Sequence, residues 1–334
     1  MQRVILLFLA IVTCQTLFAQ SADDLQKLAM QQAQASHFDS AYKTLDLALQ
    51  QKPGDIELLK NQAYICVLKR DFENGLRIGQ ALVARPDADE QCYQILGMVY
   101  KNLAEYKDAA KMYKDALQKF PKSGVLYSEY GDLLMQDNNP KDAIGAWEKG
   151  IQQDPNNSNN YYYAAKYYAS NNGLLWSLLY GEIFVNMESY TNRTAEIKQL
   201  LYDGYKNLFT GTTLADANKG SKGIAKAITD VLLKDAEPVG QDTIAAITDI
   251  RTKFIVDWVN SGSAKNYPFR LFDLHRQLIE NKGFAAYNVW LFGEAADAGK
   301  YEAWQKSHPA EWQQWDQLLH SVVFKIPAGQ YYTN

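Results

Sequence analysis

Small residues recur with a 34-residue spacing along the first 190 residues, and this recurrence most constrains the fold. With Ala22 taken as position 1, the chain divides into five blocks: 22–55, 56–89, 90–123, 124–157 and 158–191. Positions 8 and 20 hold Ala, Gly or Ser in every block: Ala29, Ala63, Gly97, Gly131 and Ala165, then Ala41, Gly75, Ala109, Ala143 and Ser177. Helices that cross with closely approaching backbones admit only such side chains. The spacing therefore predicts two closely packed helices per block.

Larger residues and prolines occupy fixed places around these small residues. Position 4 holds Leu or Tyr throughout, as Leu25, Leu59, Tyr93, Tyr127 and Tyr161. Proline falls near the end of four blocks, as Pro53, Pro86, Pro121 and Pro155. Because a proline ring interrupts the helical hydrogen-bond ladder, these positions predict the end of the second helix in each block.

The pattern resembles the tetratricopeptide repeat, a 34-residue helix–turn–helix unit. The resemblance is strongest in block 90–123, at Tyr93, Leu96, Gly97, Tyr100, Tyr106, Ala109, Tyr113, Ala116 and Pro121. It implies an all-α fold, in which residues 22–191 form a right-handed helical solenoid of about five repeats. It also implies protein or peptide binding on the concave surface, which the first helix of each repeat lines.

The rest of the chain also has a helical pattern but resembles no family. Residues 192–209 are predicted to form a capping helix, because Ile197, Leu201 and Leu208 fall on one helical face and would cover the apolar edge of the last repeat. A polar, glycine-containing stretch, 210–223, then predicts a boundary. Apolar stripes continue at helical spacing to the end of the chain without strand-like alternation. Residues 221–334 are therefore predicted to be an all-helical C-terminal domain.

The first 19 residues have the features of a secretory signal peptide. Arg3 precedes an apolar run from Val4 to Val12, and Ala19 provides a small residue at the expected cleavage point. This pattern predicts an exported protein that is periplasmic or associated with the cell envelope. A lipoprotein anchored through Cys14 is the alternative, which the bulky residues before that cysteine disfavour.

Charge and hydropathy argue against a nucleic-acid partner and against a membrane-spanning segment. The net charge of −4 argues against nucleic acid, whose binding requires a concentrated basic surface. No segment after the signal peptide approaches the roughly 20 continuous apolar residues of a membrane-spanning helix, so no transmembrane segment is expected.

Cys66 and Cys92 are the cysteines that remain after signal cleavage. They occupy positions 11 and 3 of neighbouring first helices, which places them about 12 Å apart along parallel axes. A disulfide requires Cα atoms within about 7 Å, so both residues are predicted to be buried thiols.

Catalytic and metal-binding motifs are absent from the sequence. It contains no H-E-x-x-H, no glycine-rich phosphate loop, no G-x-S-x-G and no C-x-x-C. The best metal-like set, His308, Glu311, Asp316 and His320, does not share one helical face and is better explained by surface ion pairing. We therefore expect no enzymatic activity, no cofactor and no metal. The tryptophans of the C-terminal half suggest a sugar-binding platform, but their helical spacing favours a core role.

Candidate binding residues follow from the resemblance, which assigns ligand contacts to set positions of the first helices. These residues are Lys60, Asn61, Tyr64, Gln94, Met98, Lys101, Glu129, Tyr162, Tyr163 and Lys166. Tyr162, Tyr163 and Lys166 are expected on the open side of their helix, since the neighbouring positions are needed for packing. The alternative is that the C-terminal half folds back and covers this end of the surface.

These observations favour an exported, non-enzymatic scaffold that binds a protein or peptide, with a role in assembling envelope complexes. The alternative is that residues 221–334 form a catalytic or carbohydrate-binding module, with the repeats as an adaptor. The sequence does not identify the partner.

Overall fold

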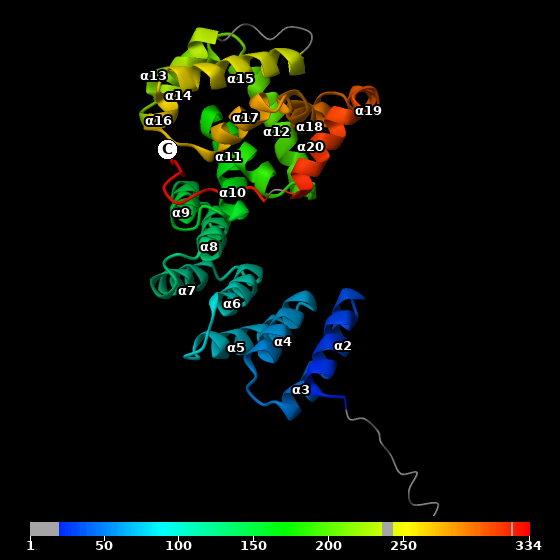
Figure 1. The fold of residues 1–334 in the computed structure, drawn as a ribbon. Coiled ribbons are helices and arrows are strands. Elements are labelled where there is room, and N and C mark those ends of the chain that lie inside the picture. The colour runs from blue at the N-terminus through cyan, green and yellow to red at the C-terminus, as the bar shows by residue number, and fades with distance from the viewer. Residues whose placement is uncertain (1–19, 236–242, 322) are drawn as a thin grey trace, which may run out of the picture. The chain divides into compact units, whose positions relative to one another are not determined.

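The computed structural model describes residues 20–235, 243–321 and 323–334, and within these ranges it contains helices and no strand (Figure 1). The all-α fold class predicted from the sequence is confirmed for this part of the chain. The chain divides into two compact units, Met1–Tyr113 (unit 1) and Lys114–Asn334 (unit 2). The predicted signal peptide and Cys14 lie outside the described residues.

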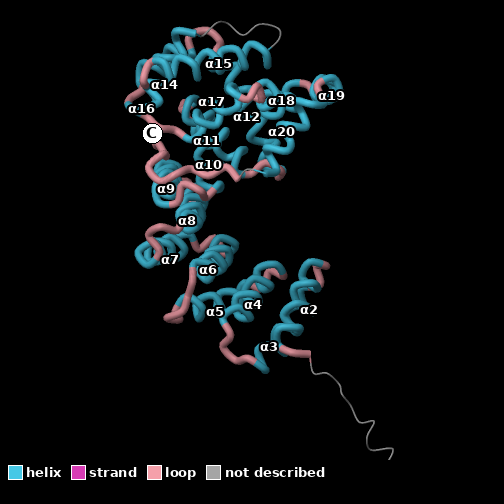
Figure 2. Tube along the Cα trace, in the orientation of Figure 1, coloured by secondary structure: helices cyan, strands magenta, loops and turns pink. Residues whose placement is uncertain are grey.

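Five helix pairs follow the predicted 34-residue frame, and Figure 2 shows the short loops that join them. Their first helices begin at residues 22, 56, 90, 124 and 158, each at position 1 of its block. The ten helices are α2 (Ala22–Gln34), α3 (Phe38–Gln51), α4 (Ile56–Leu68), α5 (Phe72–Val83), α6 (Glu90–Asn102), α7 (Tyr106–Lys119), α8 (Gly124–Gln136), α9 (Pro140–Gln153), α10 (Ser158–Ser170) and α11 (Leu174–Met187). The boundary between the two units falls within α7.

All ten small residues of the frame are buried, and two glycines show why larger ones are excluded. A Cβ atom added to Gly97 would lie 1.8 Å from the Tyr113 hydroxyl oxygen, and one added to Gly131 would lie 2.2 Å from Trp147 Nε1. Real Cβ atoms do not approach other atoms this closely, so even alanine would force a neighbouring ring to move. The close packing predicted from the spacing is therefore observed in both units.

The turn inside each helix pair has one recurring backbone conformation. Ser36, Arg70, Ala104, Asn138 and Asn172, which are 34 residues apart, have φ values of 56–62°. The N–H of the following residue donates back to the last turn of the helix, as in Glu105 N to Tyr100 O at 3.0 Å. This left-handed turn satisfies carbonyl groups that a helix end leaves unpaired.

Unit 2 continues beyond the repeats with nine further helices in its described residues. They are α12 (Asn192–Leu208), α13 (Thr213–Gly220), α14 (Gly223–Asp235), α15 (Thr243–Asn260), α16 (Ser263–Asn266), α17 (Arg270–Glu280), α18 (Phe284–Ala296), α19 (Ala298–Ser307) and α20 (Pro309–Ser321). One hydrophobic cluster extends from Leu134 to Ile326 and includes Trp258, Trp290 and Trp315. These tryptophans belong to the core. The predicted division into a capping helix and a separate C-terminal domain stays a prediction.

A repeat-like turn also joins α17 to α18, outside the predicted frame. Lys282 has a φ of 59°, and Gly283 N donates to Leu278 O at 2.8 Å. The sequence Asn281-Lys282-Gly283 parallels Asn171-Asn172-Gly173 between α10 and α11. The same local chemistry therefore builds a helix hairpin in a region without the 34-residue register.

Cys66 and Cys92 are buried free thiols in unit 1, as predicted. Burial raises the pKa of the Cys66 thiol to about 12 and that of Cys92 to about 11. Both are therefore protonated at neutral pH and act as small apolar side chains.

Candidate functional site

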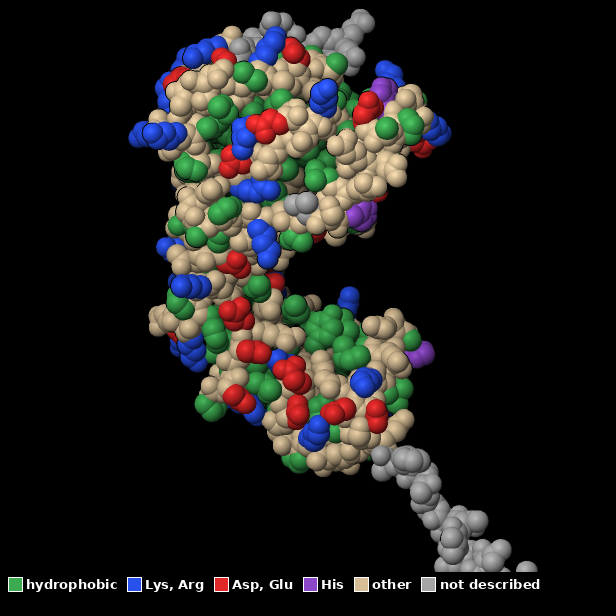
Figure 3. Space-filling view, in the orientation of Figure 1, with side chains coloured by type: hydrophobic (Ala, Val, Ile, Leu, Met, Phe, Trp, Pro, Cys, Tyr) green, Lys and Arg blue, Asp and Glu red, His purple; other side chains and the backbone are tan. Residues whose placement is uncertain are grey.

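Within unit 1, α4 and α6 present four of the predicted binding residues at or near the surface. Tyr64 is 37% exposed, and Asn61, Gln94 and Met98 are partly exposed. None of these four side chains forms a hydrogen bond to another residue in the described part of the chain. Figure 3 shows hydrophobic side chains gathered over α4 and α6 on this face. We call Asn61, Tyr64, Gln94 and Met98 the Tyr64 surface.

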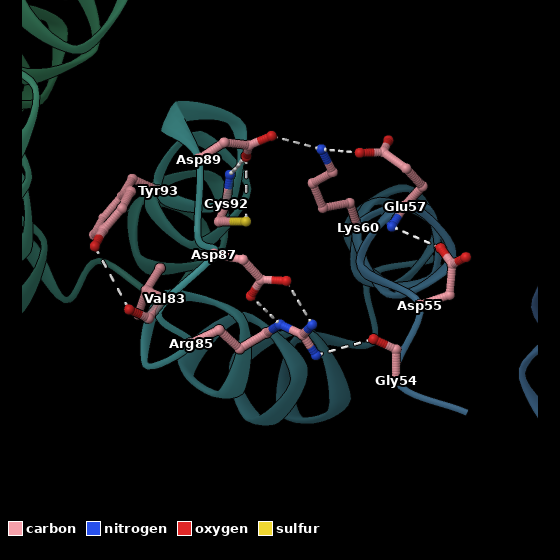
Figure 4. A network of polar contacts seen from close by, with 10 residues as sticks. All are labelled: Gly54, Asp55, Glu57, Lys60, Val83, Arg85, Asp87, Asp89, Cys92 and Tyr93. Atoms are coloured by element: carbon pink, nitrogen blue, oxygen red, sulfur yellow. Dashed lines mark hydrogen bonds and ion pairs between the residues drawn. The ribbon is translucent and has the colours of Figure 1, made fainter. Parts of the chain in front are cut away.

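Lys60, another predicted binding residue, is buried in an ion-pair network instead. Its side chain is 3% exposed, and its ammonium lies 2.6 Å from Glu57 and 2.8 Å from Asp89. Asp89 also caps α6 by accepting from Cys92 N at 3.1 Å, so Lys60 ties α4 to the start of α6 (Figure 4). Burial lowers the pKa of Lys60, but the two carboxylates more than reverse this effect, so the amine stays charged. The expectation that Lys60 lies open on the concave surface is therefore not what the structure shows.

A second link in Figure 4 joins the loop before α4 to the loop before α6. Arg85 donates to the Asp87 carboxylate at 2.7 and 2.8 Å and to the Gly54 carbonyl at 3.0 Å. Together with the Lys60 pairs, these bonds fix the start of α4 relative to the start of α6. They position the Tyr64 surface without being part of it. Lys101, at the end of α6, is partly exposed.

In unit 2, two of the three predicted binding residues of α10, Tyr162 and Lys166, contact α12. Tyr162 is 8% exposed and donates its hydroxyl to Glu196 at 2.6 Å, while the Arg193 guanidinium lies 4.9 Å from its ring centre. Lys166 is exposed and pairs with Glu196 at 2.7 Å. The expected exposure of Tyr162 is therefore wrong, because Glu196 and Arg193 of α12 and Phe184 of α11 contact this side chain.

The two other predicted residues of unit 2 keep part of their surface. Tyr163 is half-buried and stacks on Trp147 with ring centres 5.2 Å apart. Glu129 on α8 is also half-buried. Tyr163 is thus supported from beneath by Trp147, and its role as a ligand contact stays a prediction.

Sequence reasoning missed a buried polar cluster in unit 2, centred on the fully buried Glu182 of α11. Its Oε1 atom contacts the Arg251 guanidinium, accepts from the Tyr287 hydroxyl at 2.7 Å and lies 2.8 Å from His275 Nε2. Its Oε2 atom accepts from the Tyr205 hydroxyl at 2.9 Å. These partners come from four different helices, namely α12, α15, α17 and α18, so Glu182 joins the layers of the unit.

Electrostatics keep this cluster in one charge state. Burial raises the pKa of Glu182, but Arg251, His275 and Tyr287 together lower it well below its usual range. Burial lowers the pKa of His275 more than the neighbouring carboxylate raises it, so the imidazole is neutral at pH 7. An ionised carboxylate paired with arginine in a dry core is a structural element. A sequence signal existed, because Glu182 is the one charged residue in the otherwise uncharged α11.

Two cavities of unit 2 are large enough to hold a small molecule. The larger, of about 600 Å³, lies among α12, α15, α18 and α19 and is lined by aromatic and polar residues that include Tyr202, Tyr301, Trp304, Asp249, Asp297 and Lys300. Its carboxylates already have roles: Asp249 pairs with Lys253 at 2.9 Å, and Asp297 caps α19 by accepting from Lys300 N at 3.0 Å. The smaller, of about 210 Å³, lies beside α17 and α20.

The structure does not assemble the best metal-like set of the sequence. His320 lies 3.5 Å from Asp316, while His308 stacks on Trp304 with ring centres 4.5 Å apart. Among the described residues, no group of three or more His, Cys, Asp and Glu side chains could hold a metal ion. None of the helices in residues 20–235, 243–321 and 323–334 combines the length and the apolar character needed to cross a bilayer.

Comparison with models of protein families gives a match in the repeat region. A family model described as tetratricopeptide repeat matches residues 104–172, which include α7, α8, α9 and α10 in full. These residues are a tetratricopeptide-repeat segment. The resemblance seen in the residues is thereby confirmed for this part of the chain. A comparison with curated proteins gave no significant match.

Three solved structures of tetratricopeptide-repeat proteins resemble the chain at low identity. A thermophilic protein from Thermus thermophilus has 18% identity and a TM-score of 0.46, with 54% of this chain and 99% of the other covered. One from Parabacteroides merdae has 16% identity and a TM-score of 0.42, with coverages of 73% and 93%. YrrB, described as having an unusual peptide-binding site, has 15% identity and a TM-score of 0.37, with coverages of 54% and 93%.

Proposed function

We propose that this protein is an exported, non-enzymatic scaffold that binds a protein or peptide through the Tyr64 surface and serves the assembly of complexes in the cell envelope. The observation that carries the proposal is the contrast among the predicted binding residues. Lys60 and Tyr162 are committed to internal contacts, whereas the side chains of Asn61, Tyr64, Gln94 and Met98 remain accessible and make no hydrogen bond to other described residues.

The chemistry of the Tyr64 surface suits a polypeptide partner. Tyrosine provides a rigid apolar ring with a polar tip, and methionine adapts its shape to irregular apolar side chains. The amides of Asn61 and Gln94 each offer donors and an acceptor, which match the donors and acceptors of a peptide backbone. Tyr64 and Met98 occupy the same position of successive repeats, so a bound segment would contact α4 and α6 at equivalent points.

Export is supported by the charged start, short apolar run and small residue at position 19. Cell fractionation tests this part of the proposal. The protein is expected in the periplasm or with the envelope after loss of its first 19 residues. Recovery of the uncleaved chain from the cytoplasm would contradict it.

Site-specific photo-crosslinking in cells tests the binding surface. A photoreactive amino acid is placed at Tyr64 and, as a matched control, at Leu47, which is 51% exposed on the second helix α3 of the same unit. A discrete protein adduct is expected from position 64 and not from position 47, and Met98→Ala should weaken it. Identical adducts from both positions, or none from position 64, would exclude the Tyr64 surface as the binding site.

A carbohydrate-binding role for unit 2 is a second candidate, which the cavity of about 600 Å³ specifically favours. Aromatic faces with nearby carboxylate, hydroxyl and ammonium groups are the side chains that a sugar ring can stack on and bond to. A glycan array with the parent protein and the Trp304→Ala variant tests this role. Binding that Trp304→Ala abolishes would support it, and an array without signal would remove it.

A further inference from the structure

The smaller cavity of unit 2 has a lining with an unusual polar composition. Twelve residues line its volume of about 210 Å³, and the apolar ones are Leu274, Leu278, Trp315, Leu318, Leu319 and Phe324, with Gly283. The polar ones are four amides, Asn186, Gln277, Asn281 and Gln314, and a single charged residue, Arg270. No carboxylate is among the described residues that line the cavity, so the formal charge of this lining is positive.

Two of the lining residues carry buried N–H groups without an acceptor among the described residues. Trp315 is 4% exposed, and its Nε1 atom has no hydrogen-bond partner there. The Nη1 atom of Arg270 is likewise buried and without such a partner. A buried donor without an acceptor costs about 1–3 kcal/mol, and more when the donor is charged. Native proteins rarely leave two such groups beside one cavity unless a bound group supplies the acceptor.

The surroundings of Arg270 explain why its charge needs a counterion. Its guanidinium lies 5.1 Å from the Phe324 ring centre, so one side of it rests on an apolar face. Burial lowers the pKa of Arg270, and the electrostatic effect of Asp273, one turn along α17, only partly offsets this. Another polar neighbour, Asn186, has its amide N–H groups engaged by Glu182 O at 2.7 Å and the Tyr287 hydroxyl at 2.9 Å.

We propose that this cavity binds a small carboxylate attached to a branched or aromatic apolar group, with Arg270 and Trp315 donating to the carboxylate oxygens. The leucines and Phe324 would enclose the apolar group. A guanidinium and an indole N–H are pure donors, which selects an acceptor-only group over an amide or an alcohol. The carboxylate belongs either to a free small molecule or to the C-terminal residue of a polypeptide. The site lies wholly in unit 2 and is therefore independent of the Tyr64 surface.

Calorimetric titration of the chain starting at Gln20 tests the proposal with a matched ligand pair, N-acetyl-leucine and N-acetyl-leucinamide. These differ in the carboxylate alone. Saturable binding of the acid is expected, with the amide at least about tenfold weaker because it lacks the charge that Arg270 would meet. A peptide ending in leucine distinguishes the two sources, since a polypeptide terminus should bind more tightly than the isolated acid.

Three variants locate the binding. Arg270→Gln should lower the affinity for the acid by at least about tenfold. Trp315→Phe removes the indole N–H but keeps an aromatic ring, and should lower the affinity less. Arg276→Gln is the control, because Arg276 lies on the same helix, pairs with Glu280 at 2.7 Å and does not line the cavity. Circular dichroism verifies folding of each variant. Absence of saturable binding by the acid, equal binding of acid and amide, or unchanged binding in Arg270→Gln would each overturn the proposal.

Discussion

Units 1 and 2 both contain helix pairs of the 34-residue frame, but different interactions of buried charged side chains hold their helices together. In unit 1 the buried charge is Lys60, which reaches two partly exposed carboxylates at the helix starts. In unit 2 the buried polar set includes Glu182, Arg251 and His275, which meet in the middle of the core. The first arrangement joins Lys60 to residues 3 and 29 positions away, whereas the second joins Glu182 to residues 69 to 105 positions away.

This difference determines how strongly the stability of each unit responds to a single substitution. A stack of helix pairs gains stability from neighbouring contacts, each of which resembles the last. A core organised around one buried carboxylate depends on a single set of partners, and removing one partner leaves an uncompensated charge. We therefore expect unit 2 to be sensitive to point changes at Glu182 in a way that no position of the described part of unit 1 reproduces.

The composition of the units supplies separate probes for this comparison. All seven tryptophans lie between Trp147 and Trp315, in unit 2, whereas Cys66 and Cys92 lie in unit 1. In a chain starting at Gln20, tryptophan fluorescence therefore reports the unfolding of unit 2. Thiol reactivity reports the opening of unit 1, since both thiols are buried in the folded state.

The largest effect is expected from Glu182→Gln. This change leaves the buried guanidinium of Arg251 without its counterion, and breaking a buried pair in this way costs about 3–5 kcal/mol. Denaturant unfolding followed by tryptophan fluorescence should show the loss, while the thiol reactivity of unit 1 stays at the parental value. Glu196→Gln, which removes an exposed partner of Lys166 in the same unit, is the control. If the two variants unfold at the same denaturant concentration, the cluster contributes nothing specific.

The next largest effect comes from the glycines of the frame. Gly97→Ala in unit 1 and Gly131→Ala in unit 2 should each cost about 1–3 kcal/mol, because the added methyl group meets the Tyr113 or Trp147 ring. Gly97→Ala should increase thiol reactivity, and Gly131→Ala should lower the fluorescence transition. Lys101→Ala, on the surface of α6, should change neither. Parental behaviour of both glycine variants would mean that the rings have room to move.

The sequence predicted those features that repeat locally and missed those that depend on distant residues. Small residues such as Gly97 and Ala109 mark helix crossings, so the five helix pairs and their starting residues follow from the spacing. The exposure of Tyr64 also agrees with its position in the frame. Tyr162 also occupies a predicted ligand position of its repeat, but residues of α12 contact it. The repeat pattern does not describe a helix outside the repeats. Glu182, Arg251 and His275 lie far apart in the chain, so their meeting depends on the tertiary fold.

A pH change should lower the stability of unit 2 but not that of unit 1, by a smaller amount than the substitutions above. The pKa of His275 is lowered from 6.5 in the folded state, so the unfolded chain binds a proton first as the pH falls, and stability is lost below about pH 6.5. The lowered pKa of Glu182 extends this loss below its ordinary value of 4.5. Among described groups of unit 1 with shifted pKa values, the ordinary values are 3.8 for carboxyls and 9.0 or higher for the others, so none lies between about pH 5.5 and 7.5, where His275 acts.

Unfolding at pH 7.5 and 5.5 tests this expectation. The fluorescence transition should shift to lower denaturant at pH 5.5, and His275→Gln should remove most of the shift. The reaction rate of the unit 1 thiols is divided by the rate of a free thiol at the same pH, because the thiolate fraction changes with pH. The corrected rate should be the same at both pH values. A parental shift that persists in His275→Gln would assign the pH dependence to another group.

The smallest expected effect concerns the turn conformation that both units share. Ala104 has a φ of 56° and Asn138 a φ of 57°, at the same position of successive repeats. A left-handed conformation costs most residues about 1–2 kcal/mol, and asparagine tolerates it better than alanine. Glycine removes that cost but loses about 0.5–1 kcal/mol of backbone entropy. Ala104→Gly should therefore stabilise unit 1 by up to about 1 kcal/mol and lower its thiol reactivity, whereas Asn138→Gly should leave the fluorescence transition of unit 2 nearly unchanged. Destabilisation by Ala104→Gly would show that its methyl group contributes more to packing than its backbone conformation costs, and the shared turn would then not be an equivalent feature of the two units.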